Sequence, residues 1–103
     1  MKSWRLFTVI GPDSGKTISI TGLIRFGRDS DNEICIRDTQ VSRCHAQIEL
    51  VGDNFVIMDM ESTNGTFVND KRISQSTQLR VGDSISIGPA RFLVLEEATG
   101  ALG

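Results

Sequence analysis

Apolar and polar residues alternate along almost the whole chain, and no stretch shows the 3.6-residue repeat of an amphipathic helix. Short alternating runs are separated by Gly, Pro, Asn and Asp, which are typical turn residues. The predicted strands cover residues 4–10, 17–20, 23–26, 33–36, 44–50, 55–58, 66–68, 72–73, 78–79, 84–87 and 90–95. About ten or eleven short strands without a helix predict an all-β sandwich or barrel.

The alternation also predicts which side chains share a face of a strand. In the first strand the shared face carries Trp4, Leu6, Thr8 and Ile10. In the strand that begins at residue 44, one face carries Cys44, Ala46, Ile48 and Leu50, and the other carries His45, Gln47 and Glu49. Residues 55–58 are apolar at every position, which predicts a strand covered on both sides.

Length and charge limit the possible functions. The 103 residues predict one domain over 1–99, with a flexible C-terminal end at 100–103. Eleven Lys and Arg against thirteen Asp and Glu give a net charge of −2, which argues against nucleic-acid binding driven by positive charge. No apolar run approaches the roughly 20 residues of a membrane span, so we expect a cytoplasmic protein without direct membrane contact.

Cysteine and histidine are too few for a metal site or a disulfide framework. The chain has two cysteines, Cys35 and Cys44, and one histidine, His45. These side chains supply at most three ligands and include no C-x-x-C pair, which is the usual spacing at zinc sites. We therefore expect two reduced thiols, no metal and no cofactor.

Residues 11–17, GPDSGKT, are similar to a phosphate-binding P-loop. That motif has four residues between its glycines and opens a helix. Here three residues separate Gly11 from Gly15, and an alternating strand pattern follows. The segment therefore predicts a hairpin turn.

Catalytic arrangements are equally weak. Ser42 and His45 lie three residues apart, but a serine nucleophile also needs an oriented base and an oxyanion hole. No paired carboxylates stand out. A single histidine where a loop enters a strand favours a hydrogen-bonding brace, and we expect no enzymatic activity.

Three polar segments stand where loops meet strands, which is a common location for binding sites. They are residues 27–28, 42–45 and 63–66. Their guanidinium groups, hydroxyls, amide and main-chain N–H groups suit a phosphate dianion, which has three acceptor oxygens. The alternative is that Arg28 and Arg43 are solvated surface charges and that the glycines only form turns.

The same segments resemble the forkhead-associated (FHA) domain, a module that binds phosphothreonine peptides. The matching pieces are residues 26–28, 41–46 and 62–69, with further matches at 79–83 and 85–88. Together they extend the resemblance over roughly residues 5–95. It implies an FHA-like β-sandwich of about eleven strands, with the binding loops at one end.

The resemblance also implies roles for individual residues. Arg28 and Ser42 would contact the phosphate, and Arg43 would assist with phosphate or peptide backbone. Thr63 would lie beside the phosphothreonine, and Asn64 would hydrogen-bond the peptide main chain. The residues implied to support the loops are Gly27, His45, Gly65 and Asn69.

The implied function is a non-catalytic module that binds a threonine-phosphorylated protein or peptide, either in trans or within its own parent chain. One alternative is a structural interaction domain of the same fold that works without phosphate as part of a larger assembly. Another is a phosphate-ester hydrolase, which the missing nucleophile–base pair disfavours. Exposed edge strands leave the oligomeric state open.

Overall fold

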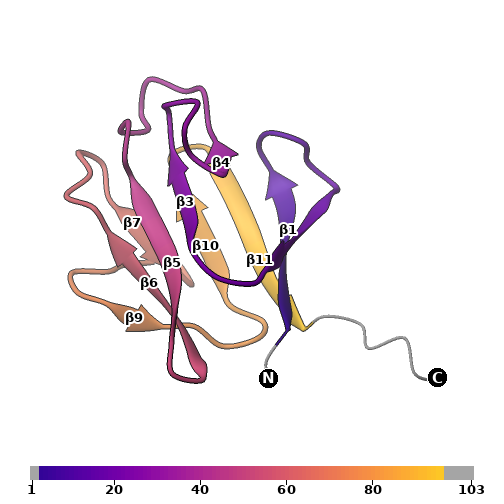
Figure 1. Ribbon diagram of the computed structural model, residues 1–103. Coiled ribbons are helices and arrows are strands. Elements are labelled where there is room, and N and C mark those ends of the chain that lie inside the picture. The colour runs from indigo at the N-terminus through magenta and orange to yellow at the C-terminus, as the bar shows by residue number, and fades with distance from the viewer. Residues whose placement is uncertain (1–2, 97–103) are drawn as a thin grey trace.

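The computed structural model describes residues 3–96, so the predicted C-terminal end at 100–103 and the last residues of the predicted domain lie outside the described residues. The described part is all-β (Figure 1). Its strands are β1 (Trp4–Ile10), β2 (Thr17–Ile20), β3 (Ile24–Gly27), β4 (Ile34–Cys35), β5 (Ala46–Val51), β6 (Asn54–Asp59), β7 (Thr66–Val68), β8 (Lys71–Arg72), β9 (Thr77–Gln78), β10 (Ser84–Ile87) and β11 (Ala90–Glu96). Between residues 3 and 96 there is no helix that could cross a membrane.

The strands form two sheets that pack face to face, as the sequence predicts (Figure 1). The six-stranded sheet has the order β2-β1-β11-β10-β7-β8, and the five-stranded sheet has the order β4-β3-β5-β6-β9. Neighbouring strands are antiparallel except for β3 and β4, which pair in parallel. The fold is therefore a β-sandwich.

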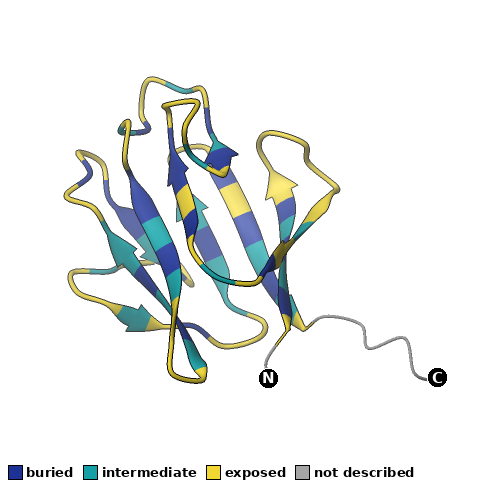
Figure 2. Ribbon diagram, in the orientation of Figure 1, coloured by how far each residue is buried: buried dark blue, intermediate teal, exposed yellow. Residues whose placement is uncertain are grey.

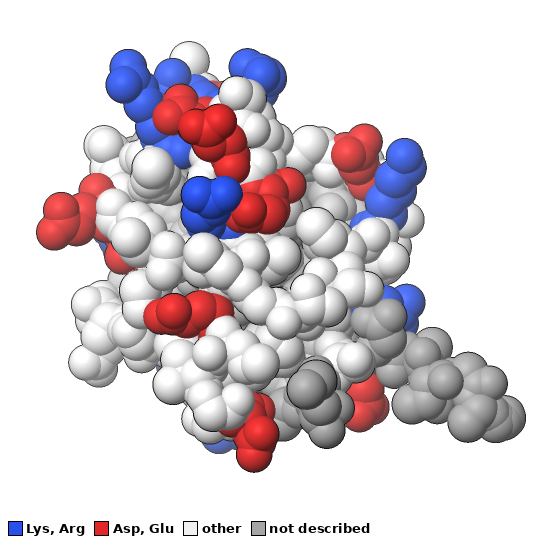
Figure 3. Space-filling view, viewed as in Figure 1, with Lys and Arg blue, Asp and Glu red and all other residues white. Residues whose placement is uncertain are grey.

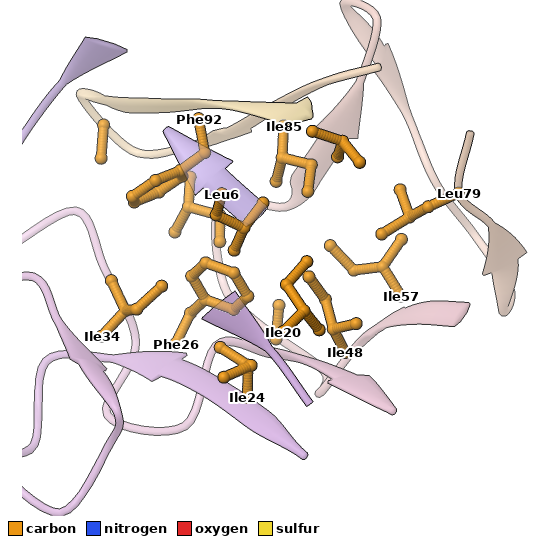
Figure 4. Close-up of a cluster of buried hydrophobic side chains, with 14 of the residues drawn as sticks. Leu6, Ile20, Ile24, Phe26, Ile34, Ile48, Ile57, Leu79, Ile85 and Phe92 are labelled. Atoms are coloured by element: carbon orange, nitrogen blue, oxygen red, sulfur yellow. The ribbon is translucent and has the colours of Figure 1, made fainter. Parts of the chain in front are cut away.

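Inward-facing residues of both sheets form one continuous core, which produces the striped burial pattern in Figure 2. Leu6, Ile85 and Phe92 of the six-stranded sheet face Phe26 and Ile48 of the other (Figure 4). The rings of Phe26 and Phe92 meet edge to face, with centroids 5.3 Å apart. Such pairs add about 0.5–1.5 kcal/mol beyond the free energy of burial.

The prediction that Ile10 shares a face with Trp4, Leu6 and Thr8 is wrong. The register of β1 against β11 shifts between Thr8 and Ile10, which marks a β-bulge. One extra residue reverses the alternation, so Ile10 faces outward opposite Arg91 and is 55% exposed. Trp4, Leu6 and Thr8 share the buried face of the strand.

The face predicted for residues 44–50 is also partly wrong. The strand begins at Ala46, so Cys44 and His45 precede it and do not follow its alternation. His45 is fully buried, unlike Gln47 and Glu49, and Cys44 is exposed, unlike Ala46 and Ile48, so neither lies with the residues predicted to share its face. Leu50 is 38% exposed, close to the turn that ends the strand.

The strand at residues 55–58 is covered less completely than its composition predicts. Phe55 and Ile57 are buried in the core, whereas Val56 and Met58 on the outer face are only half-buried. The outer face of this sheet is therefore partly open to solvent.

The P-loop-like segment forms the hairpin turn between β1 and β2. The N–H of Gly15 donates to the carbonyl of Thr8 at 2.8 Å, and the N–H of Lys16 donates to the carbonyl of Asp13 at 3.1 Å. These amides are used within the turn and are not available to cradle a phosphate.

Three loops gather at one end of the sandwich, at the top of Figure 1. They are β3–β4 (28–33), β4–β5 (36–45) and β6–β7 (60–65). The start of β1 and the end of β11 lie at the opposite end, where Trp4 pairs with Glu96.

Candidate functional site

The β3–β4 loop is held tightly against the last part of the β4–β5 loop. A Cβ atom on Gly27 would overlap the carbonyl oxygen of Arg43, so only glycine fits at the end of β3. The Asn32 side chain then joins the two segments by donating to the carbonyl oxygens of Asp29 at 2.9 Å and of Arg43 at 2.8 Å. Asn32 therefore helps to hold the two loops together, a role that the sequence does not predict.

Arg28 follows Gly27 directly and is oriented by two hydrogen bonds. Its main-chain N–H donates to the carbonyl of Ser42 at 3.0 Å, and its side-chain Nε donates to the carbonyl of Val41 at 3.0 Å. The two terminal nitrogens of the guanidinium group make no hydrogen bond within residues 3–96. Arg28 therefore presents two parallel N–H donors to solvent, an arrangement that suits two oxygens of one phosphate.

Ser42 links the β4–β5 loop to the β6–β7 loop. Its hydroxyl oxygen accepts a hydrogen bond of 3.1 Å from the main-chain N–H of Thr63. A hydroxyl that accepts in this way keeps its own proton to donate. Ser42 thus offers a donor beside Arg28, whose N–H bonds to the Ser42 carbonyl.

His45 lies beneath both loops and uses both ring nitrogens. The main-chain N–H of Ser42 donates to Nδ1 at 3.0 Å, and Nε2 lies 2.8 Å from the carbonyl oxygen of Gly65. Since Nδ1 accepts, the proton must be on Nε2, which donates to Gly65. The ring is fully buried, so it joins the two loops out of contact with solvent.

The backbone conformation of Gly65 favours glycine. Its φ of +93° is rarely adopted by other residues. A Cβ there would also lie 2.5 Å from Nε of Arg72, although that flexible side chain can move aside. The Arg72 guanidinium group therefore covers the backbone at this turn.

Asn64 and Thr63 form the exposed tip of the β6–β7 loop. Asn64 donates through Nδ2 to the carbonyl of Gln40 at 2.8 Å, which fixes the amide plane. Its Oδ1 accepts no hydrogen bond within the described residues, so it is available to a ligand N–H. The side chain of Thr63 makes no hydrogen bond within residues 3–96 either.

A buried polar cluster under the β6–β7 loop was not predicted. Asp59 at the end of β6 accepts from the Ser62 hydroxyl at 2.5 Å, from the Ser62 N–H at 3.0 Å and from the Thr66 hydroxyl at 2.7 Å. Burial alone would raise the pKa of Asp59, but the hydrogen bonds from Ser62 and Thr66 outweigh it and lower the pKa. The available signal was the D-x-x-S spacing of residues 59 and 62, since Asp side chains commonly accept hydrogen bonds from main-chain N–H groups a few residues further along.

An ion pair on the outer face of the five-stranded sheet supports the β3–β4 loop. Arg25 donates through Nη2 to Glu33 at 2.8 Å, and its main-chain N–H reaches the same carboxylate at 2.8 Å. The hydrogen bond from the Arg25 side chain is the main reason that the pKa of Glu33 falls from 4.5 to about 2. Sequence analysis missed this pair because the two residues belong to different predicted strands.

Two of the predicted site residues differ from the others: Asn69 in its position, and Arg43 in that its side chain makes no hydrogen bond within residues 3–96. Asn69 lies in the β7–β8 turn with a φ of +52°, and its amide joins Asp83 at 2.9 Å and the N–H of Ser84 at 3.0 Å. It ties that turn to β10 and contacts none of the other predicted site residues within the described chain. Arg43 is in the loop cluster, but only its main-chain oxygen is engaged there.

The charges at the loop end include both signs. Figure 3 shows Lys and Arg atoms along the upper rim, above the β3–β4 and β4–β5 loops, with Asp and Glu atoms beside them. The free guanidinium groups of Arg28 and Arg43 are therefore local cationic features of a chain whose net charge is −2.

This arrangement suits anion recognition better than catalysis. His45 contacts the main chain of Ser42 and not its hydroxyl, so the two side chains do not form a nucleophile–base pair. Within residues 3–96, no group of three or more His, Cys, Asp or Glu residues could hold a metal ion. The available groups are the donors of Arg28 and Ser42 and the acceptor of Asn64.

Comparison with known proteins agrees with this description. Residues 24–88 match the family model of the FHA domain. The glycogen accumulation regulator GarA of Mycolicibacterium smegmatis is 41% identical over 69 residues, which cover 67% of this chain and 43% of GarA. The chain thus spans less than half the length of that curated relative.

Two solved structures superpose closely. EmbR of Mycobacterium tuberculosis in complex with a low-affinity phosphopeptide has a TM-score of 0.86 and 34% identity, covering 100% of this chain and 26% of that chain. The solution structure of the FHA domain of an Arabidopsis thaliana protein has a TM-score of 0.88 and 35% identity, covering 100% of this chain and 92% of that chain. With the family match and the loop geometry, these similarities show that the chain belongs to the FHA domain family.

Proposed function

We propose that this chain is a non-catalytic module that binds phosphorylated threonine, on a partner protein or on another segment of its own parent chain. One observation carries the proposal. Within residues 3–96, the loop contacts that fix Arg28 and Ser42 leave the two terminal guanidinium nitrogens and one hydroxyl proton without partners, on two residues whose main chains are hydrogen-bonded to each other. These donors match the oxygens of a phosphate dianion.

Each site residue then has a proposed role. Arg28 binds two phosphate oxygens, Ser42 donates to the third, and Arg43 adds charge. Thr63 lies beside the phosphothreonine methyl, and Asn64 bonds the peptide main chain. The loops are held in place by Gly27, His45, Gly65 and, through the neighbouring β7–β8 turn, Asn69.

The relatives support the binding role and do not define the partner. The similar EmbR structure contains a phosphopeptide, and this chain covers 26% of EmbR. The regulatory activities named for GarA and EmbR belong to those whole proteins. What we propose for this chain is the phosphopeptide-binding step alone.

We propose no turnover and no cofactor, because the donor set stabilises a bound phosphate without a nucleophile to attack it. We also propose a cytoplasmic location. The two free thiols, Cys35 and Cys44, support it because reducing compartments keep cysteines unpaired.

The test is calorimetric titration with a degenerate phosphothreonine peptide library and matched phosphoserine and unphosphorylated libraries. We expect micromolar binding of the phosphothreonine peptides, and Arg28→Ala should weaken it by at least about tenfold, since hydrogen bonds to charged groups contribute roughly 1.5–3 kcal/mol each. Arg80→Ala is the control, because Arg80 is exposed in the β9–β10 loop at the opposite end of the sandwich. Equal binding of phosphorylated and unphosphorylated peptides that survives Arg28→Ala would instead favour a phosphate-independent interaction domain.

A further inference from the structure

A groove of about 410 Å³ opens at the side of the sandwich, lined by residues of the β1–β2 hairpin and of β4. Here the edge strand of the six-stranded sheet, β2, stands beside the edge strand of the five-stranded sheet, β4. The lining residues used below are Thr8, Lys16, Thr17, Ile18, Ile34 and Cys35. The proposed phosphate site makes no use of this groove.

Within residues 3–96, both walls of the groove present main-chain groups without a hydrogen-bond partner. The N–H of Thr8 donates to the carbonyl of Lys16 at 3.0 Å, and pairing alternates along antiparallel strands, so the N–H and C=O of Thr17 point to the free edge. On the other wall, the N–H of Ile36 donates to the carbonyl of Gly27 at 2.8 Å, so the N–H and C=O of Cys35 point away from β3. Free strand edges of this kind bind extended chains by strand addition.

A buried hydroxyl also opens onto the groove. Thr8 faces inward and is only 7% exposed, yet its hydroxyl makes no hydrogen bond within residues 3–96. In that part of the chain, the hydroxyl oxygens of Ser84 and Ser86 are the side-chain atoms that are both inaccessible to solvent and without a hydrogen bond. The Thr8 oxygen has no hydrogen bond and is not among them, so it must be accessible to solvent. The hydroxyl is therefore open to water at the groove, and a polar group of a bound ligand can take the place of that water.

The floor beside this hydroxyl is apolar. Ile34 is buried and Ile18 is half-buried, and both face the space between the sheets. An extended peptide points alternate side chains to opposite sides, so an apolar residue of such a peptide would cover these isoleucines.

The β4 wall of the groove lies next to the segment that carries Arg28. Cys35 pairs with Gly27, the residue before Arg28, and its thiol donates to the carbonyl oxygen of Arg28 at 3.5 Å. Residues that flank a phosphothreonine bound at Arg28 therefore have the β4 edge within reach.

The opposite open edge of the sandwich lacks this signal. A second groove there is lined by residues that include Asp59, Ser62 and Arg72. Asp59 and Ser62 bond each other, so the buried polar groups at that edge need no ligand.

We propose that the groove between β2 and β4 binds an extended segment of the phosphorylated partner that flanks the phosphothreonine. The segment pairs its main chain with the free edges at Thr17 and Cys35, bonds the Thr8 hydroxyl, and places an apolar side chain over Ile18 and Ile34. This inference rests on the proposed phosphothreonine binding. It extends the recognised sequence beyond the residues next to the phosphate.

The test compares two phosphothreonine peptides that differ only in their arms. One carries arms of about eight alternating Thr and Val residues on both sides, which span about 26 Å each when extended. The other carries Gly–Ser arms of the same length. We expect the strand-forming arms to tighten binding by about tenfold, which a few added main-chain hydrogen bonds account for. Amide-exchange NMR should show new protection at Thr17 and Cys35 only with the strand-forming peptide.

Variants separate the groove from the phosphate site. Thr17→Pro removes the free edge N–H, which an edge strand tolerates, and Thr8→Val removes the buried hydroxyl with little change in shape. Both should abolish the advantage of the strand-forming arms and leave binding of the Gly–Ser peptide unchanged. Gln78→Pro is the matched control, because the neighbouring Leu79 bonds to Phe55 and the Gln78 N–H faces the other open edge. Thermal melts verify that each variant is folded.

The outcomes distinguish the two proposals. Equal affinities of the two phosphopeptides for the wild-type chain, without new amide protection, overturn the groove inference alone. Failure of both phosphopeptides to bind overturns the proposed function, and the groove inference falls with it.

Discussion

Nε2 of His45 donates a hydrogen bond of 2.8 Å to the carbonyl oxygen of Gly65, which lies 20 residues further along the chain. The other ring nitrogen holds the main-chain N–H of Ser42. One neutral imidazole therefore fixes the spacing between the loop that carries Ser42 and the loop that carries Thr63 and Asn64.

His45→Phe is expected to destabilise the domain by about 2–5 kcal/mol, because it leaves a buried N–H and a buried carbonyl without partners. Urea unfolding measures the loss, and Gln47→Ala on the outer face of β5 is the control. Nitrogen NMR of the wild-type ring should show the neutral tautomer with the proton on Nε2. A ring protonated on Nδ1 would contradict the assigned hydrogen bonds.

Gly27→Ala is expected to cost roughly 1–3 kcal/mol, the usual range for forcing an extra group into a packed site. The added methyl group must displace the carbonyl of Arg43, so phosphopeptide affinity should fall with stability. Gly22→Ala is the matched control, because a Cβ at Gly22 meets no atom within 4 Å. Similar melting temperatures for the two variants would contradict the close approach at Gly27.

Arg28→Lys is expected to weaken phosphopeptide binding by about tenfold or more, because a lysine cannot bond the Val41 carbonyl and two phosphate oxygens together. Arg43→Lys should change the affinity by less than about threefold, because no side-chain hydrogen bond of Arg43 orients it within the described residues and a point charge replaces it adequately. Calorimetry on the same peptide measures both. Equal losses of affinity in the two variants would contradict the idea that the hydrogen bond from Arg28 to Val41 makes Arg28 the more important of the two arginines.

Acid is expected to destabilise the domain between about pH 4.5 and pH 2. The pKa of Glu33 is lowered to about 2, chiefly by its hydrogen bond from the Arg25 side chain, so its contribution is complete above 4.5 and disappears as pH falls through 2. The lowered pKa of Asp59 acts in the same direction. Glu33→Gln should cost up to about 1 kcal/mol at pH 7, as exposed ion pairs do, and progressively less as pH falls through 2. Glu49→Gln, on the outer face of β5, is the control in pH-dependent urea unfolding.

Phosphopeptide binding is expected to weaken below about pH 6, where the phosphate takes up its second proton. The dianion favours the donors of Arg28 and Ser42, so binding should lower the phosphate pKa by about one unit for each tenfold preference. Phosphorus NMR of the bound and free peptide measures this shift directly. An unchanged phosphate pKa would contradict recognition of the dianion.

Alternation predicted the strands well because burial of one sheet face imposes a period of two on the sequence. It failed where the backbone departs from regular pleating. At Ile10 a bulge adds one residue and reverses the faces, and a bulge has no strong sequence signal. His45 was placed on the polar face because the strand was predicted to begin two residues too early.

The loop residues named from the family resemblance are mostly brought together, but the contacts that hold them were less predictable. Glycine at position 27 is required by the Arg43 carbonyl, which comes from a loop 16 residues away in the chain. Asn32, Asp59 and Glu33 act through tertiary contacts of this kind. Their roles depend on loop conformation, which local sequence patterns do not determine.

The pairing of Trp4 with Glu96 places both ends of the described chain at the end of the sandwich away from the phosphate loops. A phosphothreonine attached after Glu96 must therefore return along the seven residues of β11, about 23 Å, before it can reach Arg28. A tether shorter than about seven residues cannot span that distance, so such a site is captured only by a second molecule. Longer tethers bring the effective concentration of an attached site into the millimolar range, where binding within one chain outcompetes dilute partners.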